Sequence, residues 1–295
     1  MNLPVIITKG QSIKYSVISN EFQRAFYDCM EILSSNRYIP SDRPILSKPD
    51  SNTKLAKQTD RTVGYRLYSL FLAPAGVSGY NTCAWATDEC RKLCLNSSGR
   101  GAMKNVQDAR IAKTKMMVES PYLFMVNMIS EIVSAMRSCS KTNDKLALRA
   151  NGTSDIPWEF VAPFIENFCI GGSCALPEKM SNLKKFKLYD YTKSFSRMKS
   201  KPSWYDMTFS YSGKNWKECK YILDHKIGRV AMVFYDEVPE SYEGYDVIRG
   251  DDDDYRFLDN PGCIVGLTYK STGKKNDEEA LASCSSKPES FVIKL

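Results

Sequence analysis

Three cysteines stand close together in the sequence, at positions 83, 90 and 94. Six residues separate the first two and three separate the last two, so that three thiols fall within one short segment. Thiolates are the preferred protein ligands of iron–sulfur clusters and of zinc, and thiols this close in sequence can reach a single centre. The spacing therefore predicts a metal site formed by Cys83, Cys90 and Cys94.

Two kinds of metal centre suit these thiols. A zinc ion that staples a fold usually takes a fourth protein ligand, and no further cysteine or histidine lies nearby in the sequence. Cys174 and Cys263 are the distant candidates for that fourth ligand. A 4Fe–4S cluster held by three cysteines instead keeps one iron open for a cofactor or substrate. We expect the cluster and keep zinc as the alternative.

A glycine-rich stretch, Gly99-Arg100-Gly101, follows the cysteines and opens a predicted helix over residues 101–118. Glycines at a helix N-terminus let backbone N–H groups approach an anion, and Arg100 adds positive charge. We therefore expect Gly99, Arg100 and Gly101 to bind a phosphate or carboxylate group of a cofactor.

Short apolar stretches alternate with helical patterns from Thr62 onward, and this order predicts parallel βα units. The sequence favours an α/β fold, a complete or partial (β/α) TIM-like barrel over residues 61–295, with residues 1–60 as an N-terminal arm that carries one helix at 19–34. The expected strands are 66–72, 146–149, 186–191, 207–210, 230–234, 245–248 and 264–269, with an edge strand at 291–294. The other expected helices are 122–137, 158–168 and 216–225.

Polar residues follow the carboxyl end of nearly every predicted strand, and in a barrel these positions meet at one rim, where such folds keep their active sites. We expect a cofactor to bind after the second strand and catalytic groups to lie at the end of the third. The alternatives are that Ser154 or Asp155 caps the next helix and that Asp190 and Lys193 form a buried ion pair. The expected cofactor ligands are Arg149, Asn151, Thr153, Ser154 and Asp155, and the expected catalytic residues are Asp190 and Lys193.

Two further groups allow a binding role beside a structural one. The acidic residues Asp251–Asp254 and Asp259 suit a divalent cation or an ion pair with Arg256. Four aromatic residues close to Lys199, Lys201 and Lys214 suit either base stacking or the core, namely Trp204, Tyr205, Tyr211 and Trp216.

The composition narrows the class of protein. No run of eighteen apolar residues occurs and the N-terminus has no leader pattern, so we expect a cytoplasmic protein without a membrane span. Cysteines in a reducing compartment stay free, and most are expected in the core. The net charge of +7 favours an anionic partner such as a nucleotide or nucleic acid. The single histidine, His225, cannot form a two-histidine metal clamp, and its position suits the end of a helix.

Several longer stretches resemble the phage gene-product-eighty-eight-like family. This resemblance extends from about Lys54 to the C-terminus and implies a phage or mobile-element origin, and hence the host cytoplasm. Some members carry a rolling-circle initiator label, whose paired-histidine nicking site a chain with one histidine does not contain. The matching stretches are 73–79, the three cysteines with Gly99–Gly101, 105–110 with 113–114, 149–159, 189–193, 208–212 and 250–257.

The order of elements is also similar to that of radical S-adenosylmethionine enzymes, which carry three cysteines in the loop after the first barrel strand. Their usual spacing is C-x3-C-x2-C, with an aromatic residue where this chain has Leu93. The similarity implies S-adenosylmethionine as a small-molecule cofactor held by residues 151–155, and an enzyme acting on a nucleotide, nucleic acid or peptide-like substrate. The alternative is a phage or plasmid nucleic-acid-binding replication accessory protein with a structural zinc or cluster.

Overall fold

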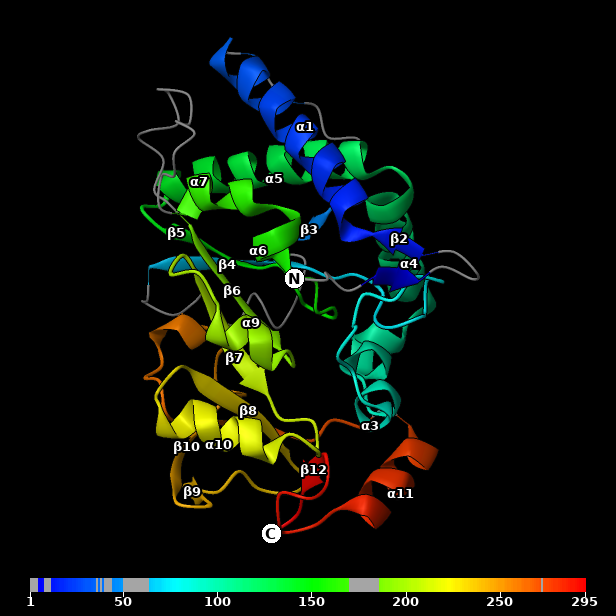
Figure 1. Ribbon diagram of the computed structural model, residues 1–295, viewed down its shortest axis with the longest axis vertical. Coiled ribbons are helices and arrows are strands. Elements are labelled where there is room, and N and C mark those ends of the chain that lie inside the picture. Colours follow the sequence, from blue (N-terminus) through cyan, green and yellow to red (C-terminus); the bar gives the residue numbers. More distant parts are fainter. Residues whose placement is uncertain are drawn as a thin grey trace. The chain divides into compact units, whose positions relative to one another are not determined.

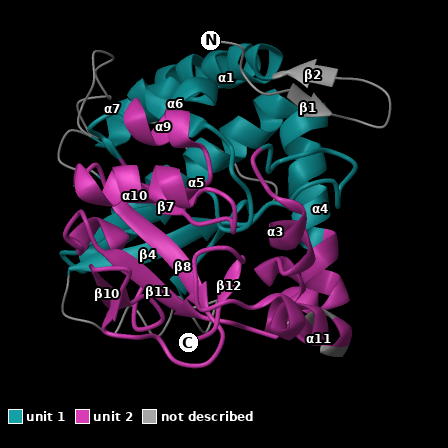
Figure 2. Cartoon of the chain, turned by 60° about the horizontal axis from the view of Figure 1, so that its bottom comes forward, with its two compact units in different colours: residues 1–84, 109–188, 202–205 teal, residues 85–108, 189–201, 206–295 magenta. Residues whose placement is uncertain are grey.

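A computed structural model describes residues 5–7, 12–35, 37, 39, 44–49, 64–169, 186–271 and 273–295 (Figure 1). The chain divides into two compact units, each built from segments that are distant in the sequence (Figure 2). Unit 1 comprises residues 1–84, 109–188 and 202–205, and unit 2 comprises residues 85–108, 189–201 and 206–295. The division between Ala84 and Trp85 falls inside the cysteine-rich segment.

Ten strands form one sheet in the order β3-β4-β5-β6-β7-β8-β11-β10-β9, with β12 beside β8. The pairs β4–β5, β7–β8, β8–β11 and β10–β11 are parallel, whereas β3–β4 and β9–β10 are antiparallel. The strands are β3 (Leu46–Ser47), β4 (Tyr65–Leu70), β5 (Lys145–Arg149), β6 (Lys187–Thr192), β7 (Tyr205–Ser210), β8 (Arg229–Phe234), β9 (Ser241–Tyr242), β10 (Tyr245–Arg249), β11 (Ile264–Thr268) and β12 (Val292–Ile293). A separate antiparallel pair joins β1 (Val5–Ile7) to β2 (Ser12–Lys14).

The predicted α/β class with mainly parallel strands is confirmed. All seven predicted strands are present, with ends shifted by at most two residues. These strands could be predicted from the sequence because strands buried on both faces form continuous apolar runs, as in β8. The strand order has two ends, β3 and β9, and among the described strands it does not close on itself, so the barrel stays a prediction.

The C-terminal strand β12 lies in a different place from the expected sheet edge. It pairs in parallel with Val233 and Phe234 of β8, whereas β7 pairs with β8 only at residues 229–231. β12 therefore occupies the position beside the carboxyl half of β8 that β7 does not cover.

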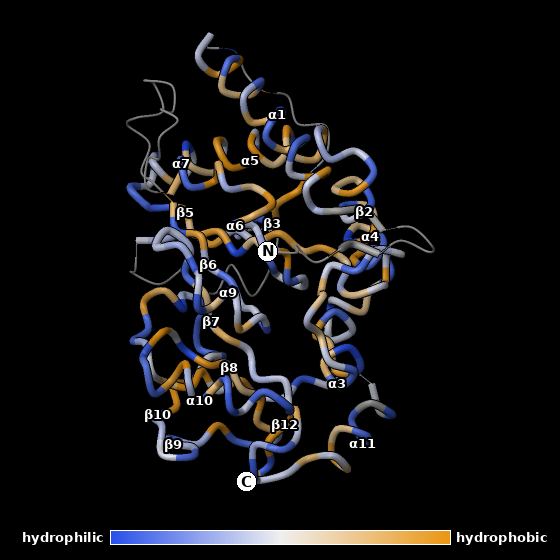
Figure 3. Tube along the Cα trace, viewed as in Figure 1, coloured by the Kyte–Doolittle hydropathy of each residue, from blue (hydrophilic) through white to orange (hydrophobic). Residues whose placement is uncertain are grey.

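Aromatic rings of two long helices build the core of unit 1. The predicted helix at 19–34 is confirmed as α1 (Tyr15–Ser34), and α5 (Pro121–Lys141) begins with proline at its first position, where no backbone N–H is needed. Phe22 of α1 stacks on Phe124 of α5, with 5.9 Å between ring centroids, and on Trp158 at 6.2 Å. Apolar residues recur along α1 at helical spacing, and orange segments recur along both helices in Figure 3. The arm at 1–60 stays a prediction, because residues 40–43 and 50–63 lie outside the described part of the chain.

The prediction of one helix over residues 158–168 was wrong. The segment contains α6 (Trp158–Val161), a 3-10 turn at Pro163–Ile165 and α7 (Glu166–Cys169). Pro163 interrupts the helix because proline has no N–H to donate and its ring clashes with the preceding turn.

The helix expected from residue 101 begins later, as α4 (Lys104–Glu119), after two 3-10 turns at Leu95–Ser97 and Gly99–Ala102. The remaining helices are α3 (Asp88–Lys92), α9 (Phe195–Lys199), α10 (Trp216–Asp224) and α11 (Lys274–Ser283), with a 3-10 turn at Arg256–Leu258. Within the described residues, none of the helices has the length and apolar character of a membrane span.

Candidate functional site

The loop after β4 and the loop after β5 meet at one edge of unit 1. These strands are parallel neighbours, so their carboxyl ends share that edge. The backbone N–H of Asp155 donates to the carbonyl oxygen of Thr82 at 2.8 Å, and the Thr82 hydroxyl donates to the carbonyl oxygen of Ala73 at 2.7 Å. The sequence argument that polar groups after successive strands gather at one edge is confirmed for this pair of loops.

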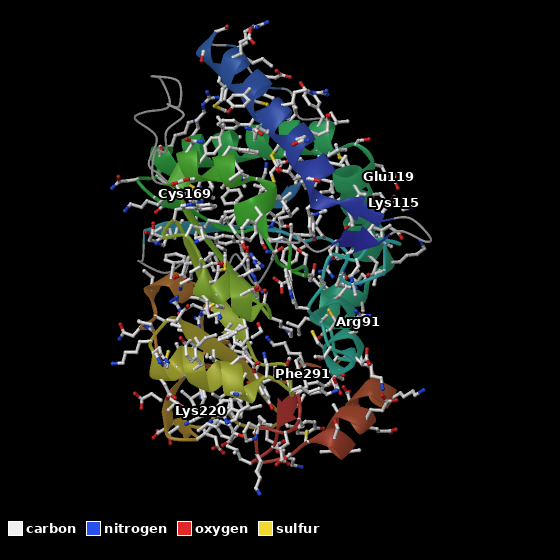
Figure 4. The ribbon with its side chains drawn as sticks, in the orientation of Figure 1. Arg91, Lys115, Glu119, Cys169, Lys220 and Phe291 are labelled. Atoms are coloured by element: carbon white, nitrogen blue, oxygen red, sulfur yellow. The ribbon has the colours of Figure 1, made fainter. Side chains whose placement is uncertain are left out.

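Helix α4 fixes the loop after β4 at two points. The Ala73 N–H donates to the Thr114 hydroxyl at 2.8 Å, and the Tyr80 hydroxyl donates to Glu119 Oε1 at 2.7 Å (Glu119 is labelled in Figure 4). Thr114 is fully buried, so this tie is shielded from water. The loop that leads to Cys83 is thus held on a helix and on a neighbouring strand.

Cys83 lies directly beside the loop after β5. Its thiol donates to the carbonyl oxygen of Thr153 at 3.7 Å, and its backbone N–H donates to Asn81 Oδ1 at 3.0 Å. The side chain is half-buried. In unit 1, Cys83 therefore lies close to the loop of residues 151–155, as predicted.

The polar side chains after β5 shape their own loop. Asn151 Oδ1 accepts from the Ser154 hydroxyl and from the Ile156 N–H, both at 2.8 Å, and Nδ2 donates to the Ile156 carbonyl oxygen at 2.9 Å. The Thr153 hydroxyl donates to the carbonyl oxygen of Leu72. Neither Ser154 nor Asp155 caps α6, because Pro157 occupies the N-cap position. The cofactor-binding role of Arg149, Asn151, Thr153, Ser154 and Asp155 stays a prediction.

Glycine is required within this loop at position 152. A Cβ atom there would lie 2.8 Å from the carbonyl oxygen of Leu70 and 2.5 Å from the ring of Phe71. The close approach lets the Gly152 N–H donate to Leu70 at 2.9 Å, which continues the pairing of β4 with β5.

Two cations of α4 extend this edge of unit 1, and we did not single them out as site residues from the sequence. The Arg110 guanidinium lies 5.4 Å from the Phe71 ring centroid, and the Lys113 ammonium donates to the carbonyl oxygen of Ile45 at 3.2 Å. Burial and, to a lesser extent, nearby Arg110 lower the pKa of Lys113 to about 8, whereas Glu131 opposes both. In the sequence, Lys113 and Thr114 lie three and four residues after Arg110, and this helical spacing could have pointed to the two cations.

In unit 2 the segment before Cys90 is fixed to the loop after β7. Thr87 caps α3: its hydroxyl accepts from the Cys90 N–H at 3.3 Å and donates to the carbonyl oxygen of Ser212 at 3.4 Å. Glu89 pairs with Lys214 at 3.4 Å. Cys90 lies in α3 and Cys94 follows two residues after its end, and both thiols are half-buried.

The glycine-rich stretch lies in a 3-10 turn before α4 and not at the N-terminus of the long helix. Gly99 has φ +53°, which favours glycine, and the Gly101 N–H donates to the carbonyl oxygen of Ser98 at 2.9 Å. The prediction that a helix terminus follows these residues directly was wrong by three positions. Anion binding by Gly99, Arg100 and Gly101 stays a prediction.

Of the two residues expected to act in catalysis, Asp190 lies in strand β6 and Lys193 directly follows its last residue. Asp190 is fully buried, and the Lys193 ammonium lies 5.8 Å from the Phe291 ring centroid. On the opposite face of β6 from Asp190, the hydroxyls of Tyr189 and Tyr191 donate to Asp254 at 3.0 and 3.2 Å. Catalysis by Asp190 and Lys193 stays a prediction.

Three of the acidic residues after β10 form ion pairs, and two of these pairs are with Arg256, as one of the two alternatives foresaw. Arg256 is almost fully buried and pairs with Asp253 at 2.6 Å and with Asp259 at 3.1 Å. Asp251 accepts from the Lys270 ammonium and the Thr268 N–H, both at 2.7 Å. Burial alone would raise the pKa of Asp251, but these two hydrogen bonds lower it below its ordinary value.

A family model described as Gene product 88 matches residues 44–286 of this sequence. The chain belongs to the Gene product 88 family. The resemblance to a phage gene-product family is thereby confirmed. No curated protein and no solved structure matches the chain, and the resemblance to radical S-adenosylmethionine enzymes gains no support from these comparisons.

The cysteines of this Gene product 88 chain differ in burial. Cys83, Cys90, Cys94 and Cys284 are half-buried, whereas the other described cysteines are buried: Cys29, Cys139, Cys169, Cys219 and Cys263. Burial raises the pKa of Cys29 and of Cys169, labelled in Figure 4, to about 12. The expectation that most cysteines belong to the core is confirmed.

The three thiols of the predicted metal site have the donor chemistry of an iron–sulfur cluster or zinc. Cys83 belongs to unit 1, and Cys90 and Cys94 belong to unit 2. In the part of the chain that the structure describes, three or more His, Cys, Asp or Glu side chains are nowhere grouped as ligands of one metal ion. Cys174, a candidate fourth ligand, lies outside the described residues.

The aromatic residues that we considered for base stacking belong mainly to the core. Trp204, Tyr205 and Tyr211 are buried, and Trp216 is half-buried. The structural alternative is therefore correct for three of the four side chains.

Proposed function

We propose that this phage-family protein binds a metal centre through Cys83, Cys90 and Cys94, and that the centre is an iron–sulfur cluster. The observation that carries the proposal is the contrast in burial among the described cysteines. Core cysteines behave as small hydrophobes, whereas a partly exposed thiol can be reached by an incoming metal ion. The three cysteines of one short segment keep that exposure, and the five core cysteines do not.

Positive charge near Cys90 and Cys94 supports the same proposal. Arg91 and Lys92 occupy the last turn of α3 (Arg91 is labelled in Figure 4). Arg100 lies in the 3-10 turn Gly99–Ala102. All three side chains are exposed. Cations close by offset the negative charge that three thiolates bring to a metal centre.

We further propose that the protein is an enzyme of radical S-adenosylmethionine type. It acts on a nucleotide, nucleic acid or peptide-like substrate in the host cytoplasm. In this proposal the mainly parallel sheet is a partial (β/α) barrel, and the active site lies at the carboxyl ends of its strands. When bound, the cluster supplies an electron to S-adenosylmethionine. The chain's own contribution is positional, because the loop after β5 lies against Cys83 and is rigidly hydrogen-bonded through Asn151.

Metal analysis after anaerobic purification tests the metal centre. We expect about four iron and four sulfide per chain in the wild type. Replacing Cys83, Cys90 and Cys94 together with serine should abolish iron binding. Cys284→Ser is the matched control, since Cys284 is also half-buried but lies outside the segment. Stoichiometric zinc without iron would overturn the cluster, and metal-free protein would overturn the centre altogether.

Reductive cleavage of S-adenosylmethionine tests the proposed radical chemistry. The protein with its cluster, reduced with dithionite, should release 5′-deoxyadenosine, and the triple serine variant should not. A fully loaded cluster that releases none would reject the radical chemistry and leave the metal centre in place.

The second candidate is a nucleic-acid-binding replication accessory protein in which zinc or a cluster only staples the fold. The net charge of +7 favours this candidate. If this candidate is correct, removal of the metal lowers the thermal stability of the protein, and the metal has no catalytic activity.

A further inference from the structure

Helices α9 and α10 of unit 2 expose an unusual set of aromatic and basic side chains. Together with His225 at the C-cap of α10 and Tyr245 of β10, we call this set the aromatic–basic face; its helical members are Phe195, Lys199, Lys220 and Tyr221, and Phe195 and Tyr245 are half-buried. Figures 1 and 2 both show α9 next to α10, and the ring of Phe195 meets the ring of Tyr221 edge-on, with 5.6 Å between centroids. The buried side of α10 is formed by Cys219, Ile222 and Leu223, so Lys220 and Tyr221 project outward.

The rings of this face are already arranged for stacking. Tyr221 is 41% exposed, and the ring of His225 lies parallel to it at 4.1 Å with an interplanar angle of 28°. His225 is the C-cap residue of α10, and its Nδ1 lies 2.9 Å from the carbonyl oxygen of Tyr221. Burial does not explain why an exposed tyrosine and an exposed histidine should stack here, because both rings remain open to water.

Ammonium groups stand beside these rings. Lys199 Nζ lies 4.8 Å from the centroid of Phe195, and Lys220 Nζ lies 5.6 Å from that of Tyr245. Lys217 and Lys226 add two exposed cations on the same helix and just after it. Helix α10 itself carries two lysines and two acidic residues: Asp224 accepts from the Tyr245 hydroxyl, and Glu218 is half-buried. With Lys199 of α9 and Lys226 included, four lysines stand against three acidic residues, Glu218, Asp224 and Glu243, the last of which acts on Lys220.

We propose that the aromatic–basic face binds single-stranded nucleic acid. Unpaired bases offer π-faces that stack on aromatic rings regardless of sequence, and lysines beside the rings neutralise the phosphates that connect the bases. An acidic protein segment would use the lysines but would have no use for the stacked rings. A duplex would hide its bases from Tyr221 and His225. The proposal is independent of the metal centre, since none of its residues lies in the cysteine segment.

Fluorescence anisotropy with the full-length protein tests the rings. The probe is a labelled oligothymidine of about 20 nucleotides, compared at low salt with a duplex of equal length. We expect the single strand to bind more tightly, and Tyr221→Ala/His225→Ala to weaken binding by about tenfold or more. Tyr27→Ala is the matched control, because Tyr27 is a helical tyrosine that is 51% exposed in unit 1. Unchanged affinity in the double variant, tighter binding of the duplex, or no binding would each overturn the proposal.

The salt dependence of the same measurement tests the lysines. Removing two phosphate contacts should reduce the slope of log K against log salt by about 1.4 for a single strand. We expect this change for Lys199→Ala/Lys220→Ala (Lys220 is labelled in Figure 4) and not for Lys104→Ala/Lys115→Ala, which removes two exposed lysines of α4. Equal changes in the two double variants would show that the charge of the whole chain, and not this face, holds the strand. Circular dichroism and thermal melting confirm that each variant is folded.

Discussion

The thiol of Cys83 donates a hydrogen bond to the carbonyl oxygen of Thr153 at 3.7 Å, across a separation of 70 residues in the sequence. This contact joins the loop after β4 to the loop after β5, the two segments that the sequence marked most strongly for chemistry. Unlike the core cysteines, Cys83 also keeps contact with solvent.

Alkylation of the native, metal-free protein should distinguish the two classes of cysteine. We expect iodoacetamide to modify Cys83, Cys90, Cys94 and Cys284 first, because these four are half-buried. Cys29, Cys169 and Cys219 should react last, since burial raises the pKa of all three thiols, to about 12 for Cys29 and Cys169, and leaves little thiolate near neutral pH. Peptide mass spectrometry over a time course gives the order of modification.

The same experiment on protein loaded with metal provides the control. A bound cluster or zinc ion should protect Cys83, Cys90 and Cys94 but leave Cys284 reactive. Equal protection of Cys284 would indicate a general loss of access and count against a centre in the cysteine segment.

Substitution of Gly152 should destabilise unit 1 through a steric clash. An alanine Cβ would lie 2.8 Å from a backbone oxygen of β4, and backbone cannot move aside as a flexible side chain can. We expect Gly152→Ala to lower the free energy of unfolding by about 1–3 kcal/mol, as overpacking does elsewhere. Urea denaturation measures this change. Gly76→Ala is the matched control, because nothing lies within 4 Å of its Cβ position, and an equal loss in both variants would rule out the clash as the cause.

Much of this edge of the sheet could be predicted from the sequence, for a physical reason. Buried parallel strands appear as apolar runs, and the residues just after them must lie at one edge, so Cys83 and residues 151–155 were expected together. The hydrogen bonds of Asn151 could not be predicted, since an amide that binds a ligand and one that braces its own loop have the same sequence. The break at Pro163 could have been predicted, because proline inside a helical pattern is a known stop.

The exposed face of α10 shows a second limit. The spacing of Cys219, Ile222 and Leu223 already placed Tyr221 on the outer side of the helix. For Trp204, Tyr205 and Tyr211 the sequence left base stacking and the core as alternatives, and all three are buried. Burial depends on contacts between distant segments, which helical periodicity does not encode.

The stability of unit 1 should depend on pH through Lys113. Its pKa falls from 10.5 to about 8 in the folded protein, mainly because burial disfavours the charged amine. The unfolded chain therefore binds more protons between pH 8 and 10.5, and the contribution of Lys113 to stability rises with pH across this window. We expect a difference of up to about 3 kcal/mol relative to Lys113→Met, at 1.36 kcal/mol per pKa unit.

Urea denaturation at several pH values, with the wild type and the variant compared at each, isolates this contribution from other titrating groups. Lys115→Met is the control, because Lys115 is exposed on the same helix. If wild type and Lys113→Met change in parallel from pH 8 to 10.5, Lys113 is charged throughout and the amine is not buried.

Removal of the Arg256 guanidinium should be the most damaging single change in unit 2. Arg256 is 1% exposed and holds the carboxylates of Asp253 and Asp259, which are themselves only partly exposed. Breaking a buried ion pair on one side leaves uncompensated charge, so we expect Arg256→Met to cost about 3 kcal/mol near neutral pH. Arg24→Met is the control, because Arg24 forms an exposed pair with Glu21 whose loss should cost less than about 1 kcal/mol.

The pH dependence of the Arg256→Met defect identifies its cause. Burial already raises the pKa of Asp259 above its ordinary value in the presence of Arg256, which opposes that shift. Without the guanidinium the pKa should rise further, and a carboxyl whose folded pKa is raised costs its full amount of stability above that pKa and progressively less as the pH falls toward the unfolded pKa. The difference between wild type and variant should therefore shrink as the pH falls from 7 toward 4. A difference that stays constant over this range would assign the loss to packing of the arginine side chain and not to its charge.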